Sequence, residues 1–290
     1  MNVHKIHYET FKKGSRTYFV SSLFFPRKAR EDVFKLYGFV RTVDNFVDVI
    51  PQKAEEFYQF KECYYRTLQG KPANDVIIDS FVELLKRKQF DPGWVDAFFY
   101  SMELDLKKGI YHKLDETLEY VFGSAEVIGL FMAKIMDLPT ESYPNARMLG
   151  RAMQYINFIR DIDEDFQLGR IYLPLEDAEL EKLEYDYLKR HPSQFESFIR
   201  HQIQRYRGWQ LEAEKGFIYI PKRYLIPIKT ASDMYKWTAR IIEKDPFIVF
   251  KKKVKPSKTD IILQITKNFL ALKKNRAEIA SAKQPVCKGT

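Results

Sequence analysis

The sequence predicts an all-α fold: a single domain built as a helical bundle around a central cavity. Apolar residues recur at helical spacing through most of the chain, and proline or glycine separates the resulting segments. Strand-like alternation is rare, and its best example is GFIYIP at 216–221. The 290 residues, 45% of them hydrophobic, contain no Gly/Ser linker and no repeat, so one large core is expected.

Proline and glycine mark where the expected helices begin and end. Residues 26–50 begin at a proline, which suits the first turn of a helix, and stop before Pro51. Residues 91–106 open with the turn signal Asp-Pro-Gly. The segments 117–139 and 145–166 follow with apolar residues at the same helical spacing. Together these segments predict the helices of the bundle.

A basic segment begins at about Lys251. From Lys251 to Thr290 the chain has eleven Lys and Arg against two acids, whereas residues 1–250 contain 37 of each sign, so the net charge of +9 lies here. Such a segment can bind nucleic acid, an anionic membrane or a phosphorylated substrate, or it can be a solvated face. Residues 258–280 are amphipathic, and we expect their apolar stripe to pack against the bundle rather than insert into a membrane. The stripe comprises Ile262, Ile265, Phe269 and Leu272.

Composition points to a cytoplasmic protein. The N-terminal residues alternate polar and apolar too often for a secretory signal, and no window of 18 apolar residues predicts a membrane span. Cys63 and Cys287 are far apart in dissimilar settings, which favours reduced thiols over a disulfide.

A stripe of polar side chains runs along the helix expected at 145–166. At about 100° per residue, with Gln154 at 0°, Asn157 falls near 300°, Asp161 near 340° and Asp165 near 20°. These side chains share an arc of roughly 80°, whereas Asp163 points to the opposite side. We therefore expect Asp163 and its neighbour Glu164 to be solvated charges.

A second stripe lies on the helix expected at 26–50. With Tyr37 at 0°, Arg41 falls near 40°, Asp44 near 340° and Asp48 near 20°, an arc of about 60°. Two helices thus carry an Asp-x-x-x-Asp pair on a narrow polar face. Four buried carboxylates are unfavourable unless they are protonated or bound to cations. Because Mg²⁺ prefers carboxylate and phosphate oxygens, the pattern suggests a site for metal and phosphate.

These motifs resemble the two aspartate-rich signatures of the squalene/phytoene synthase family, the head-to-head prenyl synthases. The first is YGFVRTVDNFVD at 37–48, and the second is QYINFIRDIDEDFQLGRIYLP at 154–174. Supporting stretches are GSRTYF, MELDL and YVFGSAEVIG, and the resemblance covers roughly residues 8–255. It implies an isoprenoid-synthase-type bundle, with residues 1–290 forming one prenyl synthase domain.

The resemblance also assigns roles to individual residues. It implies Mg²⁺, with Mn²⁺ as a substitute, held by Asp44, Asp48, Asn157, Asp161 and Asp165. The expected catalytic residues are Asp44, Asp48, Asp161, Asp165, Tyr37 and Arg41. The expected substrate-binding residues are Ser15, Arg16, Tyr18, Tyr37, Arg41, Gln154, Asn157, Arg160 and Tyr172.

The implied reaction joins two geranylgeranyl diphosphates to phytoene through a cyclopropylcarbinyl diphosphate, prephytoene diphosphate. The GSAEVIG motif and the VFKKKVKPSK tail are most like bacterial and archaeal phytoene synthases, so no NADPH is expected. A squalene or dehydrosqualene synthase using farnesyl diphosphate is the first alternative, and a non-enzymatic membrane assembly factor of the same fold is the second. The expected partners are prenyl diphosphates and the inner face of the cell membrane, with no nucleic acid; the oligomeric state stays open.

Two positions depart from the family pattern. Glu126 stands where many members have glycine, and we expect it to face another helix and to matter little to catalysis. Arg16 replaces a frequent lysine, which keeps the charge and changes its geometry.

The implied reaction passes through carbocations, which need a cavity without water. Aromatic side chains could form its wall, although ordinary core packing is the more common role for each candidate. The candidates for its wall are Tyr18, Phe19, Phe39, Phe122 and Phe131.

Overall fold

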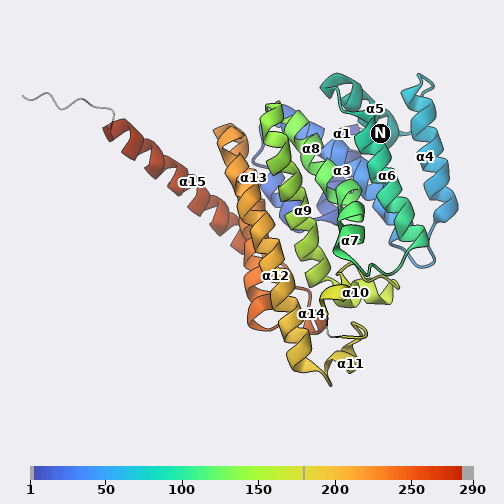
Figure 1. Cartoon of the computed structure of the whole chain (residues 1–290). Helices are drawn as coiled ribbons and strands as arrows, with labels where there is room; N and C mark the ends of the chain where they lie inside the picture. Colours follow the sequence, from blue (N-terminus) through green and yellow to red (C-terminus); the bar gives the residue numbers. More distant parts are fainter. Residues whose placement is uncertain (1–2, 179, 283–290) are drawn as a thin grey trace, which may run out of the picture.

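The computed structural model describes residues 3–178 and 180–282, and it confirms the predicted all-α fold (Figure 1). Within this part of the chain no strand forms, and the β-type pairing is an isolated parallel bridge between Ile110 and Ile171. Cys63 is a free thiol, and Cys287 lies outside the described residues. None of the described helices is both long enough and apolar enough to cross a bilayer.

Fifteen α-helices and four π- or 3-10 turns follow one another in the described part of the chain. The elements of the first half are α1 (Val3–Gly14), α2 (Arg16–Ser22), α3 (Arg27–Val47), α4 (Ala54–Leu68), α5 (Val76–Lys88), α6 (Pro92–Lys107) and α7 (Leu114–Val121). They are followed by the π-helical turn η1 (Phe122–Glu126), α8 (Val127–Ile135), the 3-10 turn η2 (Thr140–Ser142), α9 (Tyr143–Arg160) and α10 (Ile162–Gln167). The remaining elements are η3 (Leu175–Asp177), α11 (Tyr185–Leu188), α12 (Pro192–Lys215), η4 (Gly216–Tyr219), α13 (Lys222–Lys244), α14 (Ile248–Lys251) and α15 (Lys258–Ala282).

Helix α9 lies in the middle of the bundle and carries one of the two predicted polar stripes (Figure 1). It packs against α12, α8, η1 and α13. Its buried residues include Ala152, Tyr155, Ile156 and Ile159, whose spacing of three and four residues matches one helical face. Helix α3, which carries the other stripe, packs against α1, α4, α5, α6 and α8. The core therefore holds both stripes in fixed positions.

Glycine allows α9 to approach the π-helical turn closely. A Cβ atom on Gly150 would lie 2.2 Å from the carbonyl oxygen of Ala125, which is backbone and cannot move aside as a side chain can. The π turn itself lies beside the cavity described below, and such turns occur frequently at functional sites. Close packing at Gly150 thus fixes the distance between α9 and η1.

We expect Gly150→Ala to lower the free energy of unfolding by about 1–3 kcal/mol, because the added Cβ forces α9 away from η1. Urea denaturation measures this change. Gly208→Ala is the matched control: Gly208 lies inside α12, and a Cβ atom added there would meet no neighbouring atom within 4 Å. That substitution should raise stability by about 0.4–1 kcal/mol. Equal effects of the two substitutions would contradict the close packing at Gly150.

GFIYIP, the best candidate for strand-like alternation, does not form a strand. Residues Gly216–Tyr219 make the 3-10 turn η4, and Pro221 then caps α13. Phe217 and Ile220 both line the cavity, whereas Ile218 between them is 82% exposed. A 3-10 turn has three residues per turn, so apolar residues three apart lie on the same side. Over only a few residues this pattern looks similar to the alternation of a strand. A short apolar run in the sequence does not distinguish the period of a strand from that of a 3-10 turn, which is why this segment resembled a strand.

The apolar stripe predicted on the C-terminal helix is only partly correct. Helix α15 packs on α13 and α2, as expected, but the buried face contains Ile261, Ile265 and Asn268. Ile262 and Phe269, which were predicted to pack, are 54% and 46% exposed. The buried Asn268 explains the error, because its polar side chain hid the spacing in the sequence. Its Nδ2 donates a hydrogen bond to Thr230 Oγ1 on α13 at 3.1 Å.

Candidate active site

A cavity of about 670 Å³ runs through the bundle between α9 and the helices that surround it. One end is polar and contains both predicted acidic pairs, Asp44 with Asp48 and Asp161 with Asp165. The rest of the wall is largely apolar. The predicted residues that line the cavity are Ser15, Tyr18, Tyr37, Arg41, Asp44, Asp48, Gln154, Asn157, Arg160, Asp161 and Asp165.

Helix α3 positions the first acidic pair at its C-terminal end. Asp48 caps the helix, and its backbone N–H donates to the carbonyl oxygen of Asp44 at 2.9 Å. Arg41 Nη1 lies 3.8 Å from Asp44 Oδ2. Burial and the neighbouring Asp48 raise the pKa of Asp44 to about 7, although Arg41 opposes the shift. Because the pKa of Asp44 is close to neutral pH, its carboxyl group can give up a proton when another cation binds.

The second acidic pair lies where α9 ends. Asp161 is the C-cap of α9 and the N-cap of the short helix α10, with φ −104° and ψ 17°, so the single helix expected at 145–166 is broken there. The backbone N–H of Asp165 still donates to the carbonyl oxygen of Asp161 at 2.8 Å, which preserves the predicted stripe. Arg160 Nε donates to Asp161 Oδ1 at 2.7 Å. Burial and the charge of Asp161 raise the pKa of Asp165 well above its ordinary value.

The two neighbouring acids behave differently from one another. Asp163 does not line the cavity, in agreement with its predicted direction. Glu164 is 54% exposed, as expected for a solvated charge, but it lies at the cavity mouth and accepts a hydrogen bond from Lys253. Lys253 and Lys255 also line the mouth. The sequence placed them only within a generally basic segment.

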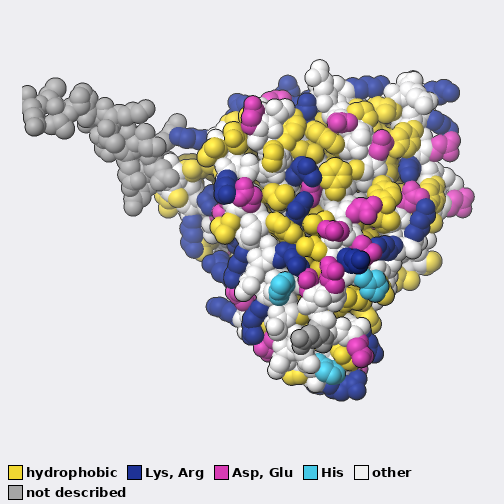
Figure 2. Space-filling view, in the orientation of Figure 1, with side chains coloured by type: hydrophobic (Ala, Val, Ile, Leu, Met, Phe, Trp, Pro, Cys, Tyr) yellow, Lys and Arg dark blue, Asp and Glu magenta, His cyan; other side chains and the backbone are white. Residues whose placement is uncertain are grey.

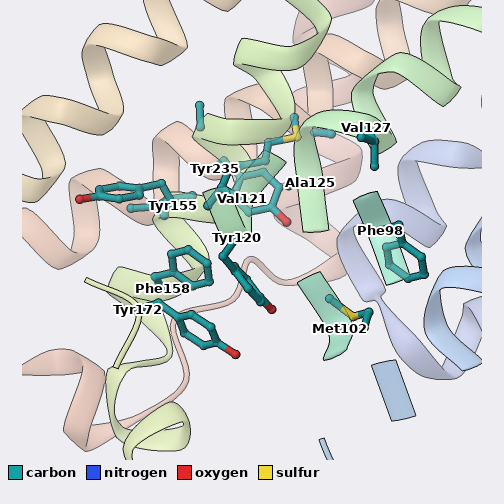
Figure 3. Close-up of a cluster of buried hydrophobic side chains, with 14 of the residues drawn as sticks. Phe98, Met102, Tyr120, Val121, Ala125, Val127, Tyr155, Phe158, Tyr172 and Tyr235 are labelled. Carbon is teal, nitrogen blue, oxygen red and sulfur yellow. The ribbon is translucent and has the colours of Figure 1, made fainter. Parts of the chain in front are cut away.

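A buried polar group supports the acidic pairs from behind. Asp105 in α6 accepts hydrogen bonds from the hydroxyl groups of Tyr120, at 2.8 Å, and Tyr172, at 2.6 Å. Figure 3 shows these two rings side by side with their hydroxyl groups pointing the same way. Arg170 Nε lies 3.8 Å from Asp105 Oδ1, and Arg170 Nη1 donates to Asp48 Oδ1 at 2.8 Å. Arg170 thus connects this buried carboxylate to the first acidic pair.

Tyr172, expected at the substrate-binding rim, belongs to this buried cluster of Asp105, Tyr120 and Arg170. Its side chain is only 5% exposed and does not belong to the cavity wall, so the structure places it behind the acidic pairs rather than at the substrate-binding rim. Burial raises the pKa of Asp105 to about 6, although Arg170 and the two hydroxyl groups oppose the shift. Asp105 and Arg170 both lie in motifs noted in the sequence, MELDL and GRIYLP, but the spacing within each motif does not reveal their pairing.

Asn157 has a free acceptor atom beside the second acidic pair. Its Nδ2 donates to Gln154 Oε1 at 3.3 Å, and its Oδ1 is buried without a hydrogen-bond partner. Buried polar atoms are normally satisfied, so this oxygen suits a ligand. Among the described residues, no three His, Cys, Asp or Glu side chains lie close enough to hold a metal ion by themselves. The donors nevertheless fit Mg²⁺, which typically takes one or two carboxylates and completes its coordination with water and phosphate oxygens.

Tyrosines and α2 form the wall next to the acidic end. The ring of Tyr37 stacks on Phe11 at 3.8 Å, and burial raises the pKa of its hydroxyl to about 12. Ser15 caps α2 by accepting from the N–H of Tyr18 at 3.4 Å. Tyr235 on α13 also lines the cavity, with its ring centroid 5.7 Å from that of Tyr18. No spacing in the sequence marked Tyr235. The side chain of Arg16 lies outside the described part of the chain.

Of the aromatic candidates for the cavity wall, only Tyr18 lies on it. Phe19, Phe39 and Phe131 pack in the core, and Phe39 stacks on Phe81 at 3.8 Å. Phe122 packs against the core from outside the cavity wall. The apolar wall is instead mainly aliphatic and sulfur-containing. It includes Val33, Leu36, Val40, Met102, Ile128, Met132, Met136, Leu149, Met153, Ile220 and Ile228.

Glu126 faces a neighbouring helix, as expected. Its carboxylate is fully buried and accepts hydrogen bonds from Arg147 Nε at 2.8 Å and Arg151 Nε at 2.6 Å, both on α9. Two charge-assisted hydrogen bonds compensate the buried charge. The side chain therefore links η1 to α9.

The family model for squalene/phytoene synthase matches residues 11–260 of the chain. The 15-cis-phytoene synthase of Pantoea ananas is 28% identical over 243 residues, which cover 79% of this chain and 78% of that protein. The 15-cis-phytoene synthase of Synechococcus elongatus is 25% identical over 258 residues, covering 82% and 83%.

Solved structures share the fold at lower sequence identity. A dehydrosqualene synthase in complex with a ligand has a TM-score of 0.82 and 20% identity, covering 94% of this chain and 97% of that one. The squalene synthase HpnC of Alicyclobacillus acidocaldarius has a TM-score of 0.75 and 20% identity, covering 84% and 94%. At these identities the match establishes the arrangement of helices.

Proposed function

The chain belongs to the squalene/phytoene synthase family, and from this we propose that it joins two geranylgeranyl diphosphates head to head to form phytoene. The reaction passes through prephytoene diphosphate and releases pyrophosphate. The observation that carries the proposal is the position of the two acidic pairs at one end of a long apolar cavity. A diphosphate belongs at the acidic end with its cations, and an isoprenoid chain belongs in the apolar part.

In this proposal each part of the site has a physical role. Asp44, Asp48, Asp161 and Asp165, with the free oxygen of Asn157, hold Mg²⁺. Bound Mg²⁺ supplies positive charge that stabilises pyrophosphate as it departs. Arg41 and Arg160 add fixed positive charge at the same end of the cavity. The aliphatic wall excludes water, which would otherwise quench the carbocation.

The length of the cavity supports a C20 substrate. Its wall extends along α9 from Asn145 to Asp161, about 24 Å at 1.5 Å per residue. An isoprene unit is roughly as long as one helical turn, about 5 Å, so four units fit along this wall. The curated relatives described above are phytoene synthases, which agrees with this choice.

A dehydrosqualene or squalene synthase using C15 diphosphates is the second candidate, favoured by the TM-score of 0.82 to a dehydrosqualene synthase. Incubation with radiolabelled farnesyl or geranylgeranyl diphosphate, each with and without NADPH, separates the candidates. We expect phytoene from the C20 substrate alone, independent of NADPH. Formation of a C30 product as the main species would overturn the choice of substrate. No condensation with either substrate would overturn the proposed activity.

We also propose that α15 binds an anionic membrane surface. Four apolar side chains on this helix, Ile262, Leu263, Phe269 and Leu270, are 46% to 59% exposed. Figure 2 shows hydrophobic side chains near the place where the C-terminal helix leaves the bundle. The segment that contains them carries the whole positive excess of the chain, and anionic lipid complements that charge.

Phe269→Ser combined with Leu270→Ser should weaken binding to vesicles that contain anionic lipid by about tenfold, because both apolar contact and insertion depth are reduced. Co-sedimentation with anionic and with zwitterionic vesicles measures the effect. Ile218→Ser is the matched control, because Ile218 is 82% exposed but lies on η4. Unchanged sedimentation of the double variant would exclude α15 as the contact.

A further inference from the structure

An extended segment between α14 and α15 brings two lysines to the cavity mouth. Lys252 has φ −164° and ψ 151°, so the chain leaves α14 in extended conformation. Val254 and Pro256 are buried, whereas Lys253 and Lys255 line the cavity. Alternating directions are the geometry of an extended chain. The buried residues therefore anchor the segment, and the two ammonium groups face the site.

Lys253 forms ion pairs with the second acidic motif. Its Nζ donates to Glu164 Oε2 and lies 3.7 Å from Asp161 Oδ1. Helix α14 packs against α10, which carries Glu164, so the fold itself holds the two segments together (Figure 1). A positive charge this close to Asp161 disfavours a second cation at the same carboxylate. The lysine and a metal ion therefore compete for Asp161.

Two arginines at the site, Arg170 and Arg160, are held more firmly than Lys253. The side chain of Arg170 is 4% exposed and donates to both Asp48 and the carbonyl oxygen of Val47. Arg160 donates to both carboxylate oxygens of Asp161. Lys253 is 35% exposed on a flexible four-carbon chain, and Glu164, its main partner, is 54% exposed. Ion pairs with this exposure are weak, so Lys253 can leave at small cost.

Lys255 adds to the positive charge at the mouth. Burial, Lys253 and Arg160 all lower the pKa of its ammonium group. Such mutual repulsion among cations is relieved by an anion. A diphosphate at the acidic end of the cavity would lie in the same cavity that Lys253, Lys255 and Arg160 line.

We propose that Lys253 is an exchangeable cation, which occupies the Asp161–Glu164 carboxylates in the free protein and transfers to the diphosphate when substrate and metal bind. The inference rests on the proposed function and deepens it, because it makes metal binding depend on the arrival of the diphosphate. Lys253 is then a substrate-binding residue of the diphosphate site.

The first part of the proposal is that Lys253 competes with metal in the free protein. Titration of Mn²⁺ into the full-length protein without substrate tests it, with free Mn²⁺ followed by electron paramagnetic resonance. We expect Lys253→Met to lower the Kd for Mn²⁺ by about three- to tenfold, since the competing charge is gone. Lys253→Gln should act in the same direction, and Lys253→Arg should restore the wild-type value. Lys251→Met is the control, because Lys251 is 60% exposed, pairs with Asp245 and does not line the cavity.

The second part of the proposal is that Lys253 contacts the bound diphosphate. Binding of inorganic pyrophosphate in the presence of Mn²⁺, measured by calorimetry, tests it. Lys253→Met should weaken it by about three- to tenfold, the opposite direction to the effect on Mn²⁺ alone. Wild-type behaviour of Lys253→Met and Lys253→Gln in either titration would overturn the inference, as would an equal change in Lys251→Met. If the wild-type protein binds neither Mn²⁺ nor pyrophosphate, the proposed function itself fails. If it binds both but Lys253 has no effect, only the inference fails.

Discussion

Replacing Asp161 by asparagine should lower kcat for head-to-head condensation by about 100- to 1000-fold while the protein stays folded. Asp161 joins α9 to α10, lies on the cavity wall and forms ion pairs with both Arg160 and Lys253. The amide keeps the shape of the side chain but removes the negative charge that a metal ion requires. Steady-state kinetics at saturating Mg²⁺, with pyrophosphate release as the readout, measures the change.

Asp163→Asn supplies the control for this experiment. Asp163 lies on the same short helix, has the same side chain and does not line the cavity, so kcat should change less than twofold by this substitution, about the effect of a remote charge. Asp44→Asn on the opposite wall should reproduce the loss seen with Asp161→Asn, because both pairs are needed around one diphosphate. Full activity of both cavity variants would exclude the metal mechanism.

The two acidic pairs could be predicted because helical periodicity alone places their members on one face. Asp44 and Asp48 are one helical turn apart, and the stripe through Asp161 survives the break in its helix because the i to i+4 hydrogen bond persists. Their meeting across one cavity was implied by the family resemblance. Periodicity carries no information on how far apart two helices lie.

The groups that no spacing revealed have partners in distant parts of the chain. Asp105 and Arg170 come from different helical hairpins, and they meet only after α6 and the segment that follows α10 have packed. Lys253 reaches the site from beyond α14. In α15, the buried Asn268 concealed which face of the helix is packed. Tertiary contacts, rather than local pattern, decide each of these positions.

Arg170→Met should lower the free energy of unfolding by about 3–5 kcal/mol, because it leaves the buried carboxylate of Asp105 without its cation. The bonds from Arg170 to Asp48 and to the carbonyl oxygen of Val47 are lost as well. Urea denaturation measures the change. Arg27→Met is the control: the Arg27 side chain is 83% exposed and pairs with Glu31 one turn away, so the expected change is within about 0.5 kcal/mol.

The loss of stability caused by Arg170→Met should also depend on pH, and the pKa of Asp105 determines the direction. The pKa of Asp105 is raised to about 6 in the folded protein, so the folded state favours the neutral carboxyl group. The stability of the fold therefore falls as the pH rises from the ordinary pKa of an aspartate toward 6. Without Arg170 the pKa should rise further, and the destabilisation by Arg170→Met should be smaller at about pH 5 than at about pH 8. Adding Asp105→Asn should recover part of the loss at the higher pH, because no buried charge then remains to be paired. A loss that is equal at both pH values, and unchanged by Asp105→Asn, would show that Arg170 stabilises the fold by packing rather than by pairing with Asp105.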